Sequence, residues 1–135
     1  MKNILKLVCT ILPLVAISCN KSTTTTYPQP SIALKKGSSY ISTDTTIKSS
    51  TSVILGLTAA KTHGDDILRS ISVLCSYNDK PDSLLFVTSL YGIGGDSFQY
   101  DYNMGTQKSG KEKYTFKATT QSGATNSVSV TISIQ

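Results

Sequence analysis

The chain has 135 residues, of which 39% are hydrophobic, and its 13 basic and 8 acidic side chains give a formal net charge of +5. This length is enough for one domain with a real hydrophobic core. The basic residues are scattered along the chain, and without a basic stripe or a basic patch interleaved with aromatics the composition argues against nucleic-acid binding.

The N-terminus has the features of an export signal. Lys2 and Lys6 are followed by an apolar run over residues 7–17 that is interrupted by Pro13. This run is shorter than the roughly 20 apolar residues of a membrane-spanning helix. A basic start followed by roughly 7–15 apolar residues is typical of a secretory signal peptide. The sequence therefore predicts that residues 1–18 are a signal peptide and not part of the fold.

The end of this signal points to a lipid anchor. Residues 14–19 read Leu-Val-Ala-Ile-Ser-Cys, with a small residue directly before the cysteine. This resembles the signals of bacterial lipoproteins, in which the cysteine is alkylated with diacylglycerol before cleavage and the new N-terminus is then acylated. The resemblance implies lipid attachment at Cys19 and a membrane as a partner, because two or three acyl chains anchor a protein stably. An ordinary signal peptide in which Cys19 is incidental is the alternative. Cys9 is a poorer candidate, because Lys6 lies three residues before it.

The use of cysteine predicts a fold without disulfides. Cys9 leaves with the signal and Cys19 is taken by lipid, so only Cys75 remains as a free thiol. Cys75 lies in an alternating apolar run and is predicted to be a small buried hydrophobe rather than a reactive thiol.

A polar segment separates the anchor from the domain. Residues 20–31 are rich in hydroxyl side chains and prolines, and they hold too little apolar surface to offset the entropy of ordering. Residues 19–31 are therefore predicted to be the lipidated cysteine and a flexible tether. The folded domain is expected over residues 32–135, beginning with a short strand at 32–35. The threonine-rich residues 40–47 are predicted to continue the same sheet edge.

The middle of the chain shows period-two alternation. In residues 51–61, alternate positions from Val53 to Ala59 are apolar, which predicts a strand with one face on a core. Residues 67–77 predict a further strand with its odd-numbered residues, Arg69 included, on one face. Residues 83–89 hold the more continuously apolar run Leu-Leu-Phe-Val. Turn-forming glycine, asparagine, aspartate and proline residues separate these strands at 62–66 and 78–82.

The C-terminal part has the same pattern. Residues 97–103, 113–120 and 127–134 alternate, with glycine-rich or polar connections at 91–96 and 105–111. The tight turn at 121–124 predicts that the last two strands form a hairpin. Seven or eight short strands, with turns at roughly 8–12-residue intervals and no helical period, predict an all-β antiparallel sandwich.

This last hairpin carries a family resemblance. Residues 113–118 read Lys-Tyr-Thr-Phe-Lys-Ala, and residues 127–134 read Ser-Val-Ser-Val-Thr-Ile-Ser-Ile. They resemble the final hairpin of immunoglobulin-like modules, nearest to the polycystic-kidney-disease-type and fibronectin-type-III-like domains. Together with the anchor, the chain resembles the small immunoglobulin-like lipoproteins of the Bacteroidota cell envelope. The resemblance implies a lipid-anchored protein of the bacterial outer membrane.

The sequence departs from antibody domains and from some relatives of this type. It has no tryptophan, and Phe116 stands where an antibody domain has its second core cysteine, so antibody-type topology is not expected. Tyr114, two residues earlier, is a candidate for the tyrosine corner. Residues 20–23 lack the acidic side chains that follow the lipid cysteine in many surface-exported lipoproteins of this group. The membrane face on which the domain lies is therefore left open.

No catalytic group is predicted. Hydrolytic catalysis needs a nucleophile, a base and an orienting group that meet in space. His63 is the single histidine, and the chain has no nucleophile motif. The glycines at 92, 94 and 95 precede a strand, whereas a phosphate cradle opens a helix. We therefore expect no enzyme activity and no cofactor.

Two binding alternatives remain open. Calcium takes carboxylate oxygens from loops, and the candidates are Asp65, Asp66, Asp79, Asp82 and Asp96. The two pairs should lie at opposite ends of one strand and not share an ion, so no metal site is assigned.

Exposed aromatics stack on sugar rings, and the candidates are Tyr91, Tyr100 and Tyr102, with burial in the core as the opposing expectation.

The sequence favours a non-enzymatic immunoglobulin-like domain with a structural role or an unidentified protein or glycan ligand. A carbohydrate-binding module serving glycan uptake and a calcium-dependent adhesion domain are the alternatives.

Overall fold

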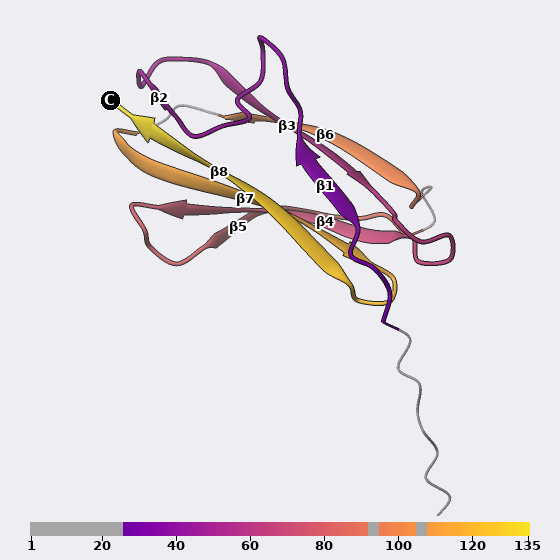
Figure 1. The fold of residues 1–135 in the computed structure, drawn as a ribbon. Coiled ribbons are helices and arrows are strands. Elements are labelled where there is room, and N and C mark those ends of the chain that lie inside the picture. The colour runs from indigo at the N-terminus through magenta and orange to yellow at the C-terminus, as the bar shows by residue number, and fades with distance from the viewer. Residues whose placement is uncertain (1–25, 92–94, 105–107) are drawn as a thin grey trace, which may run out of the picture.

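A computed structural model describes residues 26–91, 95–104 and 108–135, which form eight strands in two sheets packed face to face (Figure 1). The predicted signal peptide and Cys19 lie outside the described residues. The strands are β1 (Ser31–Leu34), β2 (Thr45–Ile47), β3 (Val53–Ala60), β4 (Leu68–Tyr77), β5 (Ser83–Ser89), β6 (Ser97–Met104), β7 (Gly110–Thr120) and β8 (Thr125–Ile134). The predicted all-β sandwich is confirmed.

The strand order is compatible with an immunoglobulin-like fold. One sheet has the order β1-β3-β6 and the other β2-β8-β7-β4-β5. All neighbouring strands are antiparallel except β2 and β8, which are parallel. In the lettering of immunoglobulin domains, β1, β3 and β6 correspond to strands A, B and E of one sheet. Strands β4, β7 and β8 correspond to C, F and G of the other. Strand β5 stays beside β4 in the larger sheet, whereas the fourth strand of a constant-type domain joins the A-B-E sheet.

The core lies between the two sheets. Alternate residues of β3, β7 and β8 are buried there, as their sequence alternation predicts. Phe116 in β7 is fully buried and lies between Val73 of β4 and Val128 of β8 in the sheet register. Burying a side chain of this kind contributes roughly 1.5–3 kcal/mol, so these inward-facing residues are the main source of stability in the described part of the chain, where Cys75 is a free thiol.

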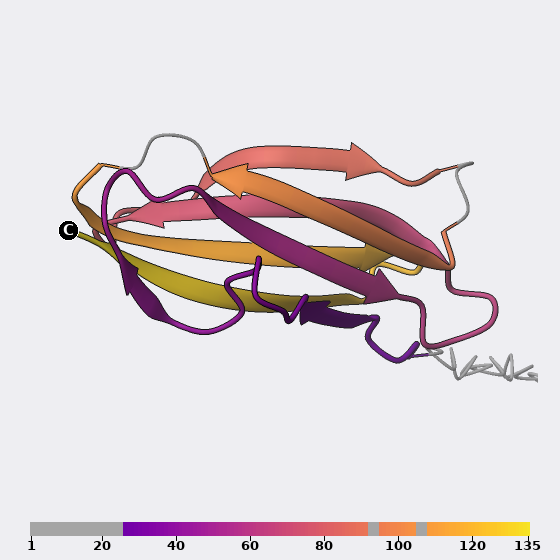
Figure 2. The same ribbon diagram turned by 90° about the horizontal axis from the view of Figure 1, so that it is seen from above.

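Strand β6 is the last strand of the smaller sheet and β5 is the last strand of the larger one, and seen from above both run along the same side of the sandwich (Figure 2). There the rings of Phe86 and Tyr100 stack with centroids 4.5 Å apart and an interplanar angle of 7°. This aromatic contact joins the edge of one sheet to the edge of the other and closes the core on that side.

The segment at 40–47 differs from its prediction. It does not continue one sheet edge: Tyr40 forms a bridge with Ile54 in the smaller sheet, and the chain then crosses to the larger sheet as β2. Asp44 stabilises this crossing, because its carboxylate accepts a hydrogen bond from the Thr131 amide at 2.8 Å. Ile47 then packs against the core from the larger sheet.

Strand β4 differs at its start. Its register to β7 shifts between Leu68 and Ser70, so that Leu68 is buried while Arg69 is exposed. A bulge of this kind inserts one residue and re-aims its neighbours. The prediction that Arg69 shares a face with Ile71 is therefore wrong. The predicted alternation holds at Ile71 and Val73, which are buried. Further along the strand Ser76 is buried, whereas Cys75 and Tyr77 are only partly buried.

Strand β7 begins at Gly110, earlier than its alternation predicts. The turn that follows β4 holds this extension in place. The amide of Asn78 donates to the carbonyl of Lys111 at 2.7 Å, and the amide of Lys111 donates to Oδ1 of Asn78 at 2.8 Å. Tyr77 adds a hydrogen bond from its hydroxyl to the carbonyl of Ser109. Part of the predicted polar loop at 105–111 is thus paired strand, and residues 105–107 lie outside the described chain.

Candidate functional site

The N-terminal segment arrives at one end of the sandwich. Thr62 Oγ1 donates to the carbonyl of Gln29 at 2.7 Å, and Asn126 Nδ2 donates to the carbonyl of Pro30 at 3.0 Å. The ring of Tyr27 meets the ring of His63 edge-on, with centroids 5.1 Å apart. These contacts fix where the chain from Cys19 meets the domain, although Cys19 itself lies outside the described residues.

Asp66, one of the predicted calcium ligands, supports the turn between β7 and β8. Its Oδ1 accepts a hydrogen bond from the Ser122 amide at 2.7 Å, and its Oδ2 accepts one from the Ser122 hydroxyl at 2.6 Å. Burial raises the pKa of this carboxyl, but the hydrogen bonds from Ser122 and Thr120 outweigh burial, so the pKa lies below its usual value. Asp66 is therefore an ionised carboxylate engaged by its own fold.

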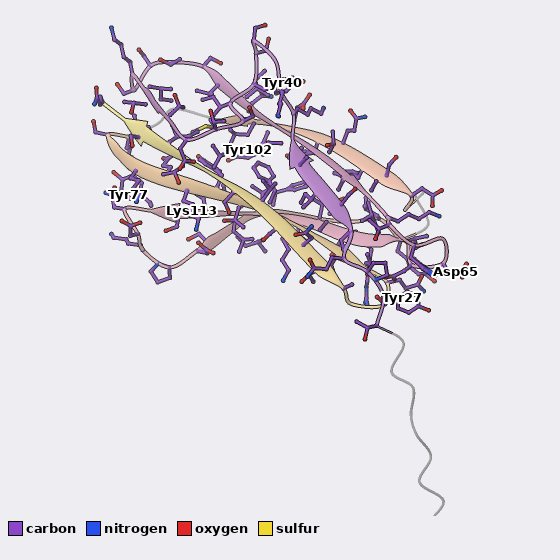
Figure 3. All side chains as sticks on the ribbon, viewed as in Figure 1. Tyr27, Tyr40, Asp65, Tyr77, Tyr102 and Lys113 are labelled. Carbon is purple, nitrogen blue, oxygen red and sulfur yellow. The ribbon has the colours of Figure 1, made fainter. Side chains whose placement is uncertain are left out.

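The other acidic candidates lie apart. Asp65 precedes β4, and the turn that contains Asp79 and Asp82 follows it. Figure 3 shows this separation, because Tyr77, the last residue of β4, lies at the opposite end of the domain from Asp65. Asp79 pairs with Lys111 at 3.2 Å, and Asp96 pairs with Lys61 at 2.6 Å.

Within residues 26–91, 95–104 and 108–135, no three His, Cys, Asp or Glu residues gather closely enough to hold a metal ion. The two loops lie at opposite ends of β4, as the sequence predicts.

Cys75 lies at the margin of the core next to a phenol and a carboxylate. Its thiol is half-buried, and the Tyr114 hydroxyl donates a hydrogen bond to Glu112 Oε2 at 2.7 Å. Burial raises the pKa of the Cys75 thiol, and the charge of Glu112 raises it further. A raised pKa lowers the thiolate fraction, which supports the packing interpretation of Cys75. Tyr114 bonds to a side chain and not to an upstream carbonyl, so it does not form the tyrosine corner considered from the sequence.

The three candidate tyrosines for sugar binding separate. Tyr100 and Tyr102 are partly buried against the core, and Tyr102 lies between the sheets (Figure 3) at 5.8 Å from the Tyr114 ring. Tyr91 is 83% exposed. Tyr91 lines a surface hollow of about 250 Å³ together with Arg69 and Gln121. A sugar-stacking role in this part of the molecule would therefore depend on Tyr91.

An exposed apolar strand was not among the predicted sites. Leu84, Leu85 and Val87 in β5 are 60%, 44% and 58% exposed, although they belong to the longest uninterrupted apolar run within residues 20–135. The sequence signal was that run together with the absence of any charged residue from 83 to 89. Without knowledge of the strand order, such a run indicates a buried central strand as readily as an edge.

No protein-family model matches the chain, and a comparison with the curated proteins gives no match. Over the described residues, the structure contains no helix of the length and hydropathy needed to span a membrane.

Proposed function

We propose that this protein is a lipid-anchored component of the bacterial cell envelope, whose immunoglobulin-like domain has a non-enzymatic binding or structural role. The observation that carries this proposal is the lipoprotein-type signal ending at Cys19, followed after a short gap by a segment attached to the domain. Residues 20–26 separate Cys19 from Tyr27, and seven residues span at most about 25 Å. A lipid on Cys19 would therefore keep the domain close to the bilayer.

Within this proposal, the more specific assignment of the chain is a polycystic-kidney-disease-type or fibronectin-III-like lipoprotein of the Bacteroidota outer membrane. Two features support it. Strand β5 lies in the same sheet as β4, β7 and β8, and the short strand β2 runs parallel to β8. The final hairpin, which carries the sequence resemblance, forms the centre of that sheet.

The assignment to binding rather than catalysis is supported by what the polar side chains do. The Asp66 carboxylate holds the Ser122 turn, and Asp101 pairs with Lys35 at 2.7 Å. These groups make their hydrogen bonds within the fold, where they stabilise loops and strand crossings.

The anchor is tested by replacing Cys19 with alanine and following incorporation of labelled fatty acid in cells. We expect wild-type protein to be labelled and membrane-bound, and Cys19→Ala to lose the label and appear in the soluble fraction. Cys9→Ala is the matched control and should keep both label and membrane attachment. Labelled Cys19→Ala protein, its continued membrane retention, or an unlabelled wild type would each disprove the lipid anchor.

A second candidate function is carbohydrate binding, which is favoured by the exposed Tyr91 ring beside Arg69 and Gln121. A glycan array should then show binding by the wild type that Tyr91→Ala abolishes, while the buried-ring variant Tyr102→Phe keeps it. Absence of glycan binding by the wild type would remove this candidate. The calcium-dependent alternative requires a melting temperature that differs between calcium and chelator.

A further inference from the structure

The outer face of the larger sheet carries lysines of β7. Tyr114 and Phe116 of this strand are buried in the core, so the residues between and beside them point away from it. Lys113 and Lys117 are exposed on that outer face. In the described chain, neither ammonium group lies within ion-pair distance of a carboxylate. These two lysines therefore form a basic area on one face of the sheet.

No carboxylate from the strands of the larger sheet opposes these lysines. Glu112 is the single acidic residue in the five strands, and it accepts a hydrogen bond from the hydroxyl of the buried Tyr114, which places it on the inner side. On the smaller sheet, by contrast, Lys35 pairs with Asp101 at 2.7 Å. The acidic residues around the larger sheet stand in loops before or after its strands, and they are Asp44, Asp65, Asp66, Asp79 and Asp82. The centre of the outer face is therefore positively charged.

The same face carries exposed apolar side chains beside the lysines. Across the sheet, the row of paired residues through Lys117 ends at Val87 of β5, and the next row on this face joins Leu74 to Leu84. Lys113 lies in the row after that, so the two lysines lie on either side of the leucine row. Leu84 and Val87 are 60% and 58% exposed. Two strand spacings, about 10 Å, separate the backbone of β7 from that of β5, so the basic and apolar side chains form one continuous surface.

This combination fits an anionic lipid surface better than other occupants. A soluble polyanion would neutralise the lysines but leave Leu84 and Val87 in water. A strand added beside β5 would satisfy backbone groups at the edge but leave the lysines on the face without a partner. A membrane surface offers phosphate groups above an apolar layer, and lysine stems lie along apolar surface while their charged ends reach phosphate.

We propose that the outer face of the larger sheet docks on an anionic lipid surface. Leu84 and Val87 enter the headgroup layer, and Lys113 and Lys117 lie at the lipid phosphates. The inference rests on the proposed envelope location, which brings a membrane within reach, but the contact itself needs no lipid on Cys19.

The position of the N-terminal segment is compatible with this contact. Asn126 of β8 donates a hydrogen bond to the carbonyl of Pro30 at 3.0 Å, so the segment arrives at the end of the larger sheet. The seven residues between Cys19 and Tyr27 span at most about 25 Å. This reach exceeds the spacing of about 10 Å between packed sheets. The membrane that holds the lipid can therefore be the membrane that the face contacts.

The test measures vesicle binding by the full-length Cys19→Ala protein, so that no lipid on the protein contributes. Binding is followed by co-sedimentation with vesicles of phosphatidylcholine alone or with about one-third phosphatidylglycerol. We expect binding to the anionic vesicles that weakens as salt is raised, and binding at least about tenfold weaker to the neutral ones. In the same background, Lys117→Gln should weaken binding about fivefold and the Lys113→Gln/Lys117→Gln double variant about twentyfold.

Two further variants make the test specific. Lys36→Gln removes the same charge from the exposed segment after β1, and it should change binding by less than about twofold. Val87→Ser keeps all charges, and it should weaken vesicle binding about threefold or more while leaving binding to heparin, a soluble polyanion, unchanged. Both positions are exposed, so the fold tolerates the substitutions.

The outcomes separate this contact from the anchor. Absence of binding to the anionic vesicles, equal effects of Lys36→Gln and Lys117→Gln, or a Val87→Ser variant that binds vesicles like its parent would each overturn the proposal. Binding to heparin without binding to vesicles would also overturn it, in favour of a soluble polyanion. A wild type without fatty-acid label would disprove the anchor, whereas vesicle binding by the unlipidated protein would still establish the contact.

Discussion

The structural role of Asp66 can be assigned only when the fold is known. In the sequence it belongs to a polar loop, where an aspartate pair suggests a solvated turn or a calcium ligand. In the structure its carboxylate is buried and bridges to Ser122, which is 56 residues away along the chain. It joins the loop before β4 to the turn of the β7–β8 hairpin. Two charge-assisted hydrogen bonds in a shielded position are stronger than those between neutral groups.

Removal of this carboxylate should destabilise the domain. We expect Asp66→Ala to lower the free energy of unfolding in urea by about 1.5–3 kcal/mol, because the Ser122 amide and hydroxyl lose a charged acceptor. Asp65→Ala, at the exposed neighbouring position, is the control and should change stability by less than about 0.5 kcal/mol. Equal effects of the two substitutions would show that the Asp66 bridge carries no stability.

The same residue predicts a pH dependence with a definite sign. The pKa of Asp66 is lower in the folded protein than in the unfolded chain, so its contribution is fully present above the usual aspartate pKa. The contribution is lost as pH falls through the lowered value. The stability difference between the wild type and Asp66→Ala should therefore be large at pH 7 and shrink toward pH 2, as measured by urea unfolding at several pH values. A difference that grows on acidification would contradict this assignment.

At the scale of elements, Gly56 lets the segment between β1 and β2 lie on the outer face of β3. A Cβ atom at this position would lie 2.7 Å from atoms of both Lys35 and Tyr40. These two side chains converge on Asp101 of β6, with Lys35 Nζ at 2.7 Å and the Tyr40 hydroxyl at 3.1 Å. Because Gly56 has no side chain, the segment between β1 and β2 can pack on β3 and reach Asp101 of β6.

Gly56→Ala should disrupt this contact. We expect a loss of about 1–3 kcal/mol in unfolding free energy, since the added methyl group must displace two packed side chains. Gly64→Ala is the matched control, because no atom lies within 4 Å of a Cβ built at that loop glycine. Thermal unfolding should show a lower melting temperature for Gly56→Ala alone, and a Gly56→Ala variant as stable as the wild type would refute the close packing.

At the scale of the whole molecule, both sheets depend on one shared hydrophobic core. Phe116 is fully buried near its centre, whereas Phe98 is partly buried at its margin. Phe116→Ala should cost about 3–5 kcal/mol, which is a large share of the stability of a domain of this size. Phe98→Ala should cost clearly less, as measured by the midpoint of urea unfolding. Equal costs would mean that the centre and the margin are packed alike.

The sequence by itself determined most of the strands, and it carries the lipoprotein-type pattern from which lipid attachment at Cys19 is predicted. Period-two alternation is a local property, since each residue of a strand faces either the core or solvent, and it correctly located β3, β7 and β8. A lipobox is likewise a linear motif, and the prediction for Cys19 needs no fold. What the sequence left open was which strand lies beside which, because strand pairing joins residues far apart in the chain.

The tertiary structure alone decided the features that depend on such pairing. It moved residues 45–47 to the larger sheet, turned Arg69 outward through a bulge, and gave Asp66 a partner in a distant turn. It also placed the apolar run of β5 at a sheet edge, where Leu84 and Val87 face solvent. A run of this composition occurs both in buried central strands and at edges. Only the strand order shows that, among the described residues, this run forms the last strand of its sheet.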